Sequence, residues 1–204
     1  LETVEFEGAN GQLHLWSRRP STPAGTPVVA DLDGDGVVEV VVQAGTQEVV
    51  CLEAPRDQQG APVVRWQMAG YGQTNNAPFH WGVVAADLDL NGETEVLFAS
   101  EARSGDAGLM AVSGAGEVKW HGVFEGVDGS MPIWNFSGLS YWSVGHYRSA
   151  EKMDVFATLR RGKGGSETGF LLDGHSGEIV WESNGYSGRS LGGHPSASGD
   201  VDGD

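Results

Sequence analysis

The sequence predicts an all-β chain built from repeated four-stranded units. Two motifs recur along its 204 residues, an acidic loop that contains glycine and a short strand that ends in tryptophan. Stretches with helical periodicity are absent, and 32 glycines separate short runs of β-branched and other apolar residues. Because both motifs recur at intervals of about 50 to 60 residues, we expect stacked or radially arranged units.

The first acidic loop, Asp31 to Glu39, has the composition of a calcium site. Carboxylates stand at loop positions 1, 3, 5 and 9, with glycine at position 6. Oxygen atoms at these positions, together with a backbone carbonyl at position 7, are ligands that a hard cation prefers. An EF-hand would need Glu at position 12 and a following helix, but Val42 stands there in a β-branched run. The loop is therefore predicted to join two strands around Ca²⁺; the alternative is an Asp/Gly-rich hairpin turn without an ion.

The same pattern recurs at Asp87 to Glu95 and begins again at Asp200. Loop starts at 31, 87 and 200 are separated by 56 and 113 residues, so a further copy is expected halfway, near residue 144. The loop at Asp200 has no acid at position 9 within this chain and is expected to be empty or disordered. The predicted calcium ligands are Asp31, Asp33, Asp35, Val37, Glu39, Asp87, Asp89, Asn91, Glu93, Glu95, Asp200, Asp202 and Asp204.

The tryptophan motif defines the strands of each unit. Trp16, Trp66, Trp120 and Trp181 each end a short run that follows a glycine turn, at spacings of 50, 54 and 61 residues. Their rings are expected to fill the core between neighbouring sheets. The predicted strands are 27–30, 38–43, 48–53 and one ending at 66; then 83–86, 95–99, 108–113 and 117–120; then 142–146, 154–159, 169–173 and 178–181.

Four-stranded units of this length are the blades of β-propellers. The expected divisions are a blade remnant at 1–20, blades at 21–70 and 71–125, a degenerate blade at 126–185 and the start of another at 186–204. About three and a half blades are therefore expected here, as part of a ring of roughly seven or eight, because closed propellers avoid free sheet edges.

Charge and hydropathy narrow the classes of partner. The net charge of −16 argues against nucleic acid, which needs a basic face. No apolar run approaches the roughly 18 residues of a membrane span. The single cysteine, Cys51, allows no intrachain disulfide and is expected to be a small buried apolar residue. Because calcium loops of this kind suit surroundings with millimolar calcium, an extracellular or periplasmic location is expected.

The segment Phe79 to Gly92 resembles an FG-GAP/VCBS repeat. It reads Phe-His-Trp-Gly-Val-Val-Ala-Ala-Asp-Leu-Asp-Leu-Asn-Gly, and it departs from the repeat by carrying His80 and Trp81 between phenylalanine and glycine. The resemblance implies the calcium-loop blade of integrin α-subunits and of many secreted bacterial propellers. Such propellers serve both adhesion and polysaccharide cleavage, and rhamnogalacturonan lyases are one enzymatic example.

The third unit departs from the acidic pattern. Aligned on its second strand, Asp154 stands opposite the position-9 acids of the other loops, while His146 and Arg148 replace the first two aspartates. No calcium is expected there. One interpretation is structural, with a largely buried Arg148 guanidinium replacing the ion by pairing with Asp154 or Glu151.

The other interpretation of the third unit is catalytic. Arginine would neutralise the carboxylate of a uronic acid, and histidine or tyrosine would move the proton in a β-elimination. On a strand, Tyr147 would point away from His146 and Arg148, which argues against joint action unless all three lie in an irregular loop. The candidate catalytic residues are His146, Tyr147, Arg148, His80 and His194, and the candidate sugar-stacking residues are Trp134 and Tyr141.

The sequence therefore predicts an extracellular calcium-binding propeller that acts on acidic polysaccharide or another glycan as a polysaccharide lyase. The alternative is a non-catalytic adhesion, scaffold or carbohydrate-binding propeller, in which the third blade has only lost its acids. In both cases the remaining blades of the ring are expected partners.

Overall fold

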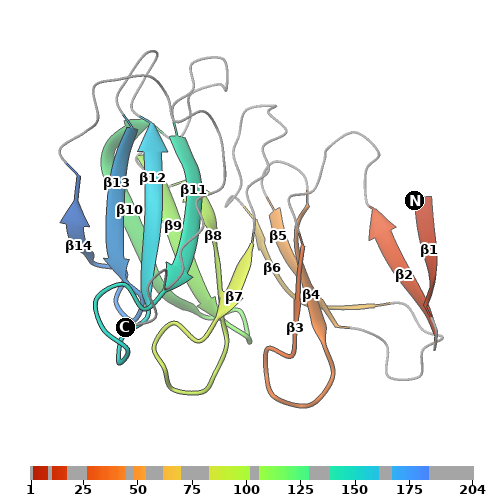
Figure 1. Cartoon of the computed structure of the whole chain (residues 1–204). Helices are drawn as coiled ribbons and strands as arrows, with labels where there is room; N and C mark the ends of the chain where they lie inside the picture. The colour runs from red at the N-terminus through yellow and green to blue at the C-terminus, as the bar shows by residue number, and fades with distance from the viewer. Residues whose placement is uncertain are drawn as a thin grey trace.

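The computed structural model describes residues 2–8, 11–17, 27–44, 48–53, 62–69, 83–101, 106–128, 138–160 and 167–183. These residues form a two-stranded hairpin followed by three four-stranded antiparallel sheets, and they contain no helix (Figure 1). The described part of the chain accordingly has no helix that could cross a membrane. The prediction of an all-β chain with four-stranded units is confirmed.

Each sheet is a meander in which consecutive strands pair antiparallel. The hairpin is β1 (Glu2–Gly8) and β2 (Gly11–Ser17). The first sheet contains β3 (Val28–Ala30), β4 (Glu39–Ala44), β5 (Glu48–Glu53) and β6 (Val63–Ala69). The second contains β7 (Val84–Ala86), β8 (Glu95–Glu101), β9 (Asp106–Ser113) and β10 (Val118–Asp128). The third contains β11 (Gly138–Gly145), β12 (Asp154–Arg160), β13 (Glu167–Asp173) and β14 (Ile179–Glu182).

The fourth strands differ from the prediction because they do not end at tryptophan. Trp120 pairs with Ala111, yet β10 continues to Asp128, since β9 begins at Asp106 and still offers partners to the added residues. Strand β6 likewise continues to Ala69. The tryptophans therefore lie within these strands, at fixed positions of the hydrogen-bond register.

The three sheets pack face to face in the order of the sequence (Figure 1). Side chains alternate between the two faces of each strand, so the second sheet offers one apolar face to the first sheet and the other to the third. Cys51 lies in the first of the two resulting cores and is fully buried, as expected. The first core joins Leu32, Val41, Val49 and Cys51 to Val83, Val96, Phe98, Met110 and Val112. The second joins Leu88, Leu97, Leu109, Ala111, Trp120 and Phe124 to Val155, Ala157, Phe170 and Leu172.

A tryptophan and a glycine turn form the joint between consecutive sheets. The indole Nε1 of Trp66 donates a hydrogen bond of 2.9 Å to the carbonyl of Gly114 in the next sheet. Trp120 repeats this contact with Gly174 at 2.7 Å. Each ring lies against a second glycine of the same turn, Gly116 or Gly177, where an added Cβ would come within 2.6 Å or 2.5 Å of the ring.

The expectation that the tryptophans fill the core between sheets is therefore confirmed at the two joints. Trp66 packs against the first core and Trp120 is only 7% exposed within the second. Trp181 is different, because its side chain is 50% exposed. The side chain of Trp16 is outside the described residues.

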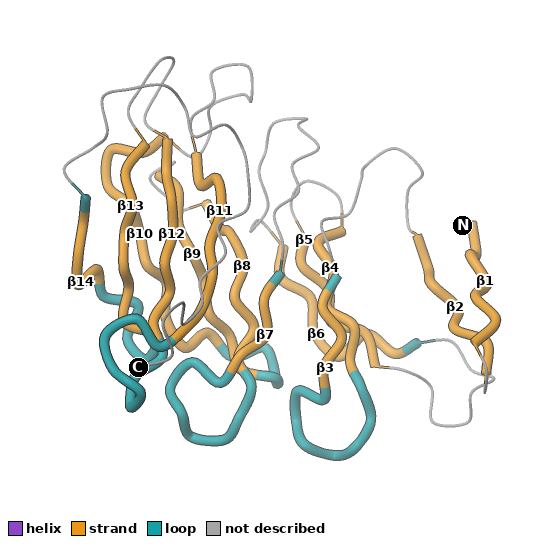
Figure 2. The backbone as a smooth tube through the Cα atoms, in the orientation of Figure 1, coloured by secondary structure: helices purple, strands orange, loops and turns teal. Residues whose placement is uncertain are grey.

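The connections between the first and second strands of the sheets lie along one edge of the molecule (Figure 2). We call residues 31–38, 87–94 and 146–153 the first, second and third turns. The cross-strand pairs that close them join residues 30 and 39, 86 and 95, and 145 and 154, so all three turns have the same length. Equivalent positions in the three turns can therefore be compared one by one.

Candidate metal centres

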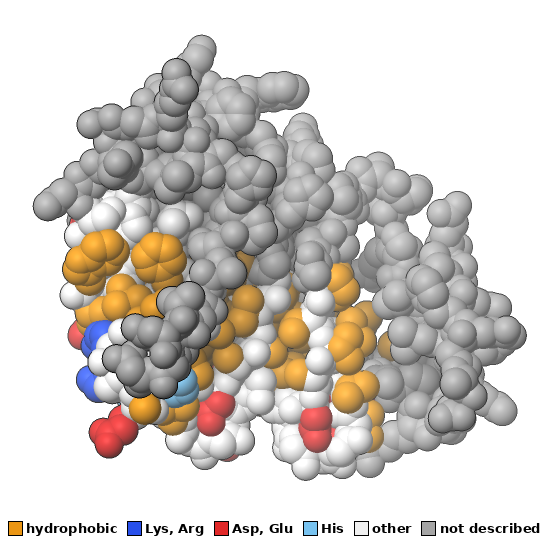
Figure 3. All heavy atoms as spheres, in the orientation of Figure 1, with side chains coloured by type: hydrophobic (Ala, Val, Ile, Leu, Met, Phe, Trp, Pro, Cys, Tyr) orange, Lys and Arg blue, Asp and Glu red, His pale blue; other side chains and the backbone are white. Residues whose placement is uncertain are grey.

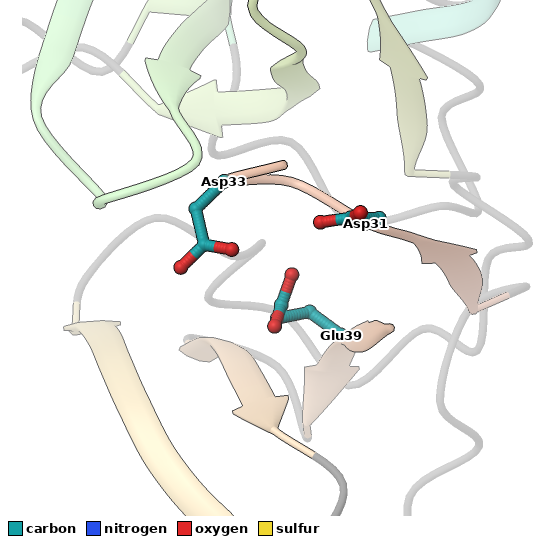
Figure 4. Close-up of side chains that lie close together, drawn as sticks. All are labelled: Asp31, Asp33 and Glu39. Carbon is teal, nitrogen blue, oxygen red and sulfur yellow. The ribbon is translucent and has the colours of Figure 1, made fainter. Parts of the chain in front are cut away.

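The first turn brings three carboxylates together. An oxygen atom from each of Asp31, Asp33 and Glu39 lies within 4.8 Å of the others. Figure 4 shows their side chains pointing toward a common space from the turn and from the start of β4. A group of this composition offers the oxygen ligands that hard divalent cations prefer.

Backbone amides hold the first turn in this shape. The Asp31 carboxylate accepts hydrogen bonds from the N–H groups of Gly34, Asp35 and Gly36 at 2.8, 3.1 and 2.9 Å. Gly36, at loop position 6, has a φ of +83°, a conformation that glycine adopts without strain. The first turn wraps around Asp31, because the Asp31 carboxylate accepts hydrogen bonds from three successive backbone amides.

The second turn repeats the arrangement. Asp87, Asp89 and Glu95 form the same group of three within 4.8 Å. The Asp87 carboxylate accepts hydrogen bonds from the amides of Asn91 and Gly92 at 3.0 and 2.8 Å, and Gly92 has a φ of +91°. The shared acidic pattern of the two turns thus gives the same geometry in both.

The glutamate of each acidic group is the first residue of a strand and is buried. Glu39 and Glu95 are 1% and 2% exposed. One oxygen of each, Oε2, accepts a hydrogen bond from the amide of Leu32 or Leu88 at 2.8 and 2.9 Å. The other, Oε1, accepts no hydrogen bond from any residue that the structure describes.

Burial raises the pKa of both glutamates. Desolvation is the main cause, and the amide hydrogen bond from Leu32 or Leu88 opposes it. Neighbouring aspartates raise the pKa of each glutamate further by charge repulsion. The charges of Arg65 and Lys119 oppose this repulsion only in part, because the pKa of each glutamate stays raised. A buried oxygen without a hydrogen bond beside several carboxylates is the environment that a further cation would stabilise.

The other predicted ligands take different places. Asp35 and Asn91 are exposed and accept hydrogen bonds from the amides of Val37 and Glu93 at 2.8 and 2.6 Å. Asp35 is not a member of the group that Asp31, Asp33 and Glu39 form. Asp200, Asp202 and Asp204 lie outside the described residues.

Two basic residues that were not predicted from the sequence adjoin the acidic groups. Arg65 on β6 donates hydrogen bonds of 2.7 Å to both Asp33 and Glu53. Lys119 on β10 lies 3.7 Å from carboxylate oxygens of both Asp89 and Glu95. Each stands immediately before the recurring tryptophan, which is the signal that would have revealed them.

The third turn has the same backbone plan with different chemistry. By register, His146 and Arg148 occupy the places of Asp31 and Asp33, and Asp154 occupies that of Glu39. Arg148 donates to the fully buried Asp154 through its amide at 3.1 Å and through Nε at 2.8 Å. Its Nη2 also donates to Asp173, and this hydrogen bond lowers the pKa of that carboxyl.

The predicted structural pairing of Arg148 with Asp154 is therefore observed. The guanidinium stays partly exposed, with 28% of the Arg148 side chain accessible, instead of being largely buried as the structural interpretation expected. The difference arises because Arg148 crosses the edge of the sheet to reach Asp173, which pairs with Asp154 on the neighbouring strand.

His146 and Tyr147 are exposed in the third turn. The Nδ1 atom of His146 lies 2.9 Å from the carbonyl of Lys152, where it donates as the N–H of the ring. The Tyr147 hydroxyl hydrogen-bonds Ser143 at 2.8 Å. All three candidate catalytic residues of this turn thus have partners that shape the turn.

The remaining candidates cannot be placed relative to this turn. His80, His194 and Trp134 lie outside the described residues. Tyr141 belongs to β11, where its backbone pairs with Thr158, and its side chain is not described.

Comparisons with known proteins do not assign the chain to a family. No family model matches it, and the search of curated proteins found no match either. The resemblance to FG-GAP/VCBS repeats stays a prediction.

Proposed function

We propose that the first and second turns each bind one calcium ion, and that the chain is a calcium-stabilised segment of a β-propeller. The observation that carries this proposal is the Oε1 of Glu39 and of Glu95, which is buried beside two aspartates, accepts no hydrogen bond from the described residues, and lies no closer than 3.9 Å to Arg65 Nη1 or 3.7 Å to Lys119 Nζ. In the third turn the buried Asp154 is neutralised by direct hydrogen bonds from Arg148, whereas a bound cation would offset the desolvation of Glu39 and of Glu95 in the first two turns.

The donor set favours calcium over the other common divalent ions. Only oxygen ligands are present in the two groups, which disfavours zinc and other thiolate- or imidazole-seeking metals. The loop curls around its first aspartate with a left-handed glycine at position 6, and flexible oxygen-rich loops of this kind suit calcium better than octahedral magnesium. Asp31, Asp33 and Glu39 would hold one ion, and Asp87, Asp89 and Glu95 the other.

Calorimetric titration of the full chain with Ca²⁺ tests this proposal. We expect two sites in the wild type, one in Glu39→Gln or Glu95→Gln, and none in the double variant. At a calcium concentration of about 100 times Kd, each site should add about 2.7 kcal/mol to the free energy of unfolding. Glu117→Gln, which changes an exposed glutamate of the β9–β10 turn, is the matched control. Absence of binding at millimolar calcium would refute the proposal.

We also propose a non-catalytic scaffold or glycan-binding role in an extracellular or periplasmic setting. The engagement of Arg148 with two carboxylates supports this role over lyase activity, because a uronate would have to compete with both for the guanidinium.

Lyase activity predicts an absorbance rise near 235 nm from the unsaturated uronate product. The assay is a panel of pectic, alginate, ulvan and glycosaminoglycan substrates with the chain and any longer protein that contains it; a rise that His146→Ala abolishes would favour the lyase.

A further inference from the structure

Three equivalent rows of side chains cross the three sheets. Each row runs through one cross-strand register, from the second strand through the third to the tryptophan of the fourth. The rows are Val41, Cys51 and Trp66; Leu97, Ala111 and Trp120; and Phe156, Leu171 and Trp181. In the first two sheets the row packs against the next sheet, so it belongs to an intersheet core.

The row of the third sheet is exposed. Phe156 and Leu171 are half-buried, whereas all four of their counterparts in the first two sheets are fully buried. Trp181 is 50% exposed, against 7% for Trp120. Figure 3 shows hydrophobic side chains gathered on the side of the molecule where the third sheet lies.

The exposure of the second residue in each of the three turns follows the same trend. Leu32 and Leu88 are 4% and 2% exposed, because a glycine turn of the next sheet lies on their backbone. An added Cβ at Gly114 would come within 2.2 Å of the Leu32 carbonyl oxygen, which shows how close this approach is. The equivalent residue of the third turn, Tyr147, is 37% exposed. We call Tyr147, Phe156, Leu171 and Trp181 the outer face of the third sheet.

We propose that the outer face of the third sheet docks a fourth sheet of the same kind. The docking element would be the turn between the third and fourth strands of that sheet. Its chemistry follows from the two joints described above: one glycine carbonyl accepts the Trp181 indole N–H, and a second, left-handed glycine leaves space for the ring, as Gly174 and Gly177 do for Trp120.

The sequence favours a following unit of this polypeptide over a second copy of the chain. After Trp181, the residues Asp200-Val201-Asp202-Gly203-Asp204 repeat the start of the acidic turns. This segment follows Trp181 by 19 residues, and the first two acidic turns follow Trp16 and Trp66 by 15 and 21. The joint contains no carboxylate, so the inference does not rest on calcium binding.

A chimera made only of this sequence tests the inference. Residues 1–204 are followed directly by a second copy of residues 92–128, so that Asp200–Asp204 take the places of residues 87–91 and the added segment supplies Gly114 and Gly116. The measurement is hydrogen exchange of the indole N–H groups by NMR, with Trp66 and Trp120 of the same molecule as internal references. The matched control is the chimera with Gly116→Val in the added copy alone.

In the unextended chain the Trp181 indole should exchange faster than those of Trp66 and Trp120. In the chimera its exchange should slow by about tenfold or more, and Gly116→Val in the added copy should restore fast exchange. Unchanged exchange at Trp181 would overturn the inference, whether the added segment folds or stays unfolded on three intact sheets. A dimer of the unextended chain, seen by sedimentation and lost in Trp181→Ala, would overturn it in favour of self-association.

Discussion

Arg148 and Asp154 form an ion pair at the position where the other two turns gather their carboxylates. The same guanidinium also reaches Asp173 on the third strand. In the first sheet Arg65 makes the matching contact with Glu53, which is the third-strand residue equivalent to Asp173. Arg65, on the fourth strand of its sheet, and Arg148, in a turn, therefore pair with carboxylates at equivalent positions of the first and third sheets.

Replacing Arg148 with methionine should destabilise the chain without changing calcium binding. The substitution keeps much of the aliphatic stem but leaves the buried Asp154 without its cation, and breaking such a pair is more damaging than losing an exposed one. We expect the melting temperature in excess chelator to fall by about 2–6 °C. Lys152→Met, at an exposed cation of the same turn, is the control, and an equal loss in both variants would contradict the role assigned to Arg148.

The stabilisation by Arg148 should depend on pH. Its hydrogen bond lowers the pKa of Asp173 in the folded chain, so the contribution is present above the ordinary aspartate pKa of about 3.9 and is lost as pH falls through the lowered value. The difference in urea midpoint between wild type and Arg148→Met should therefore be largest above about pH 5 and shrink toward pH 3. When Asp173 is replaced by Asn, the part of this pH dependence that comes from Asp173 should vanish. If the effect of Arg148→Met depends on pH in the same way in the Asp173→Asn background, Asp173 is not the group responsible.

Cys51 should be a reporter of unfolding. Its thiol is fully buried in the first core, and burial raises its pKa to about 12, so almost no thiolate exists near neutral pH. We expect only slow reaction with a thiol reagent under native conditions, through transient unfolding, and fast, full reaction in denaturant. Labelling should slow further when Ca²⁺ is added, because binding to the first turn would stabilise the sheet that carries Cys51. Fast labelling of the native chain would contradict the burial.

Gly177 should be more sensitive to substitution than Gly36, although both have positive φ values of +71° and +83°. An added Cβ at Gly36 meets nothing within 4 Å, whereas at Gly177 it lies 2.5 Å from the Trp120 ring. In excess chelator, Gly36→Ala should cost about 1–2 kcal/mol from backbone strain alone. Gly177→Ala should cost about 2–4 kcal/mol, because overlap with the indole adds to that strain. Equal unfolding free energies for the two variants would show that the Trp120 ring can move to make room for the added Cβ.

Repetition is what made the fold predictable from the sequence. The acidic loops and tryptophans recur in step, so the four strands of each unit could be assigned by analogy as well as by local composition. The equivalence of Asp154 with Glu39 and Glu95 followed from the same alignment, and the register confirms it. Local patterns were weakest at strand ends, since the length of β10 depends on how far its neighbour extends.

The cations beside the acidic groups were less predictable because they come from distant strands. Arg65 lies 32 residues from Asp33 in sequence, and the two meet only because β4 pairs with β5 and β5 pairs with β6. The second partner of Arg148 was missed for the same reason, since Asp173 meets Asp154 across the strands β12 and β13. Contacts of this kind depend on sheet register, which the sequence specifies through the whole core and not through a local motif.

The indole hydrogen bonds to Gly114 and Gly174 also give the molecule a polarity. Each donor lies on the sheet earlier in the chain and each acceptor on the later one, so the two sides of the joint are chemically different. An interface of this type is heterologous and cannot be shared by two copies around a twofold axis. Addition of sheets through it runs in a single direction, and it ends only when the donor side of the last sheet meets the acceptor side of the first sheet or when a differently built cap covers the exposed indole.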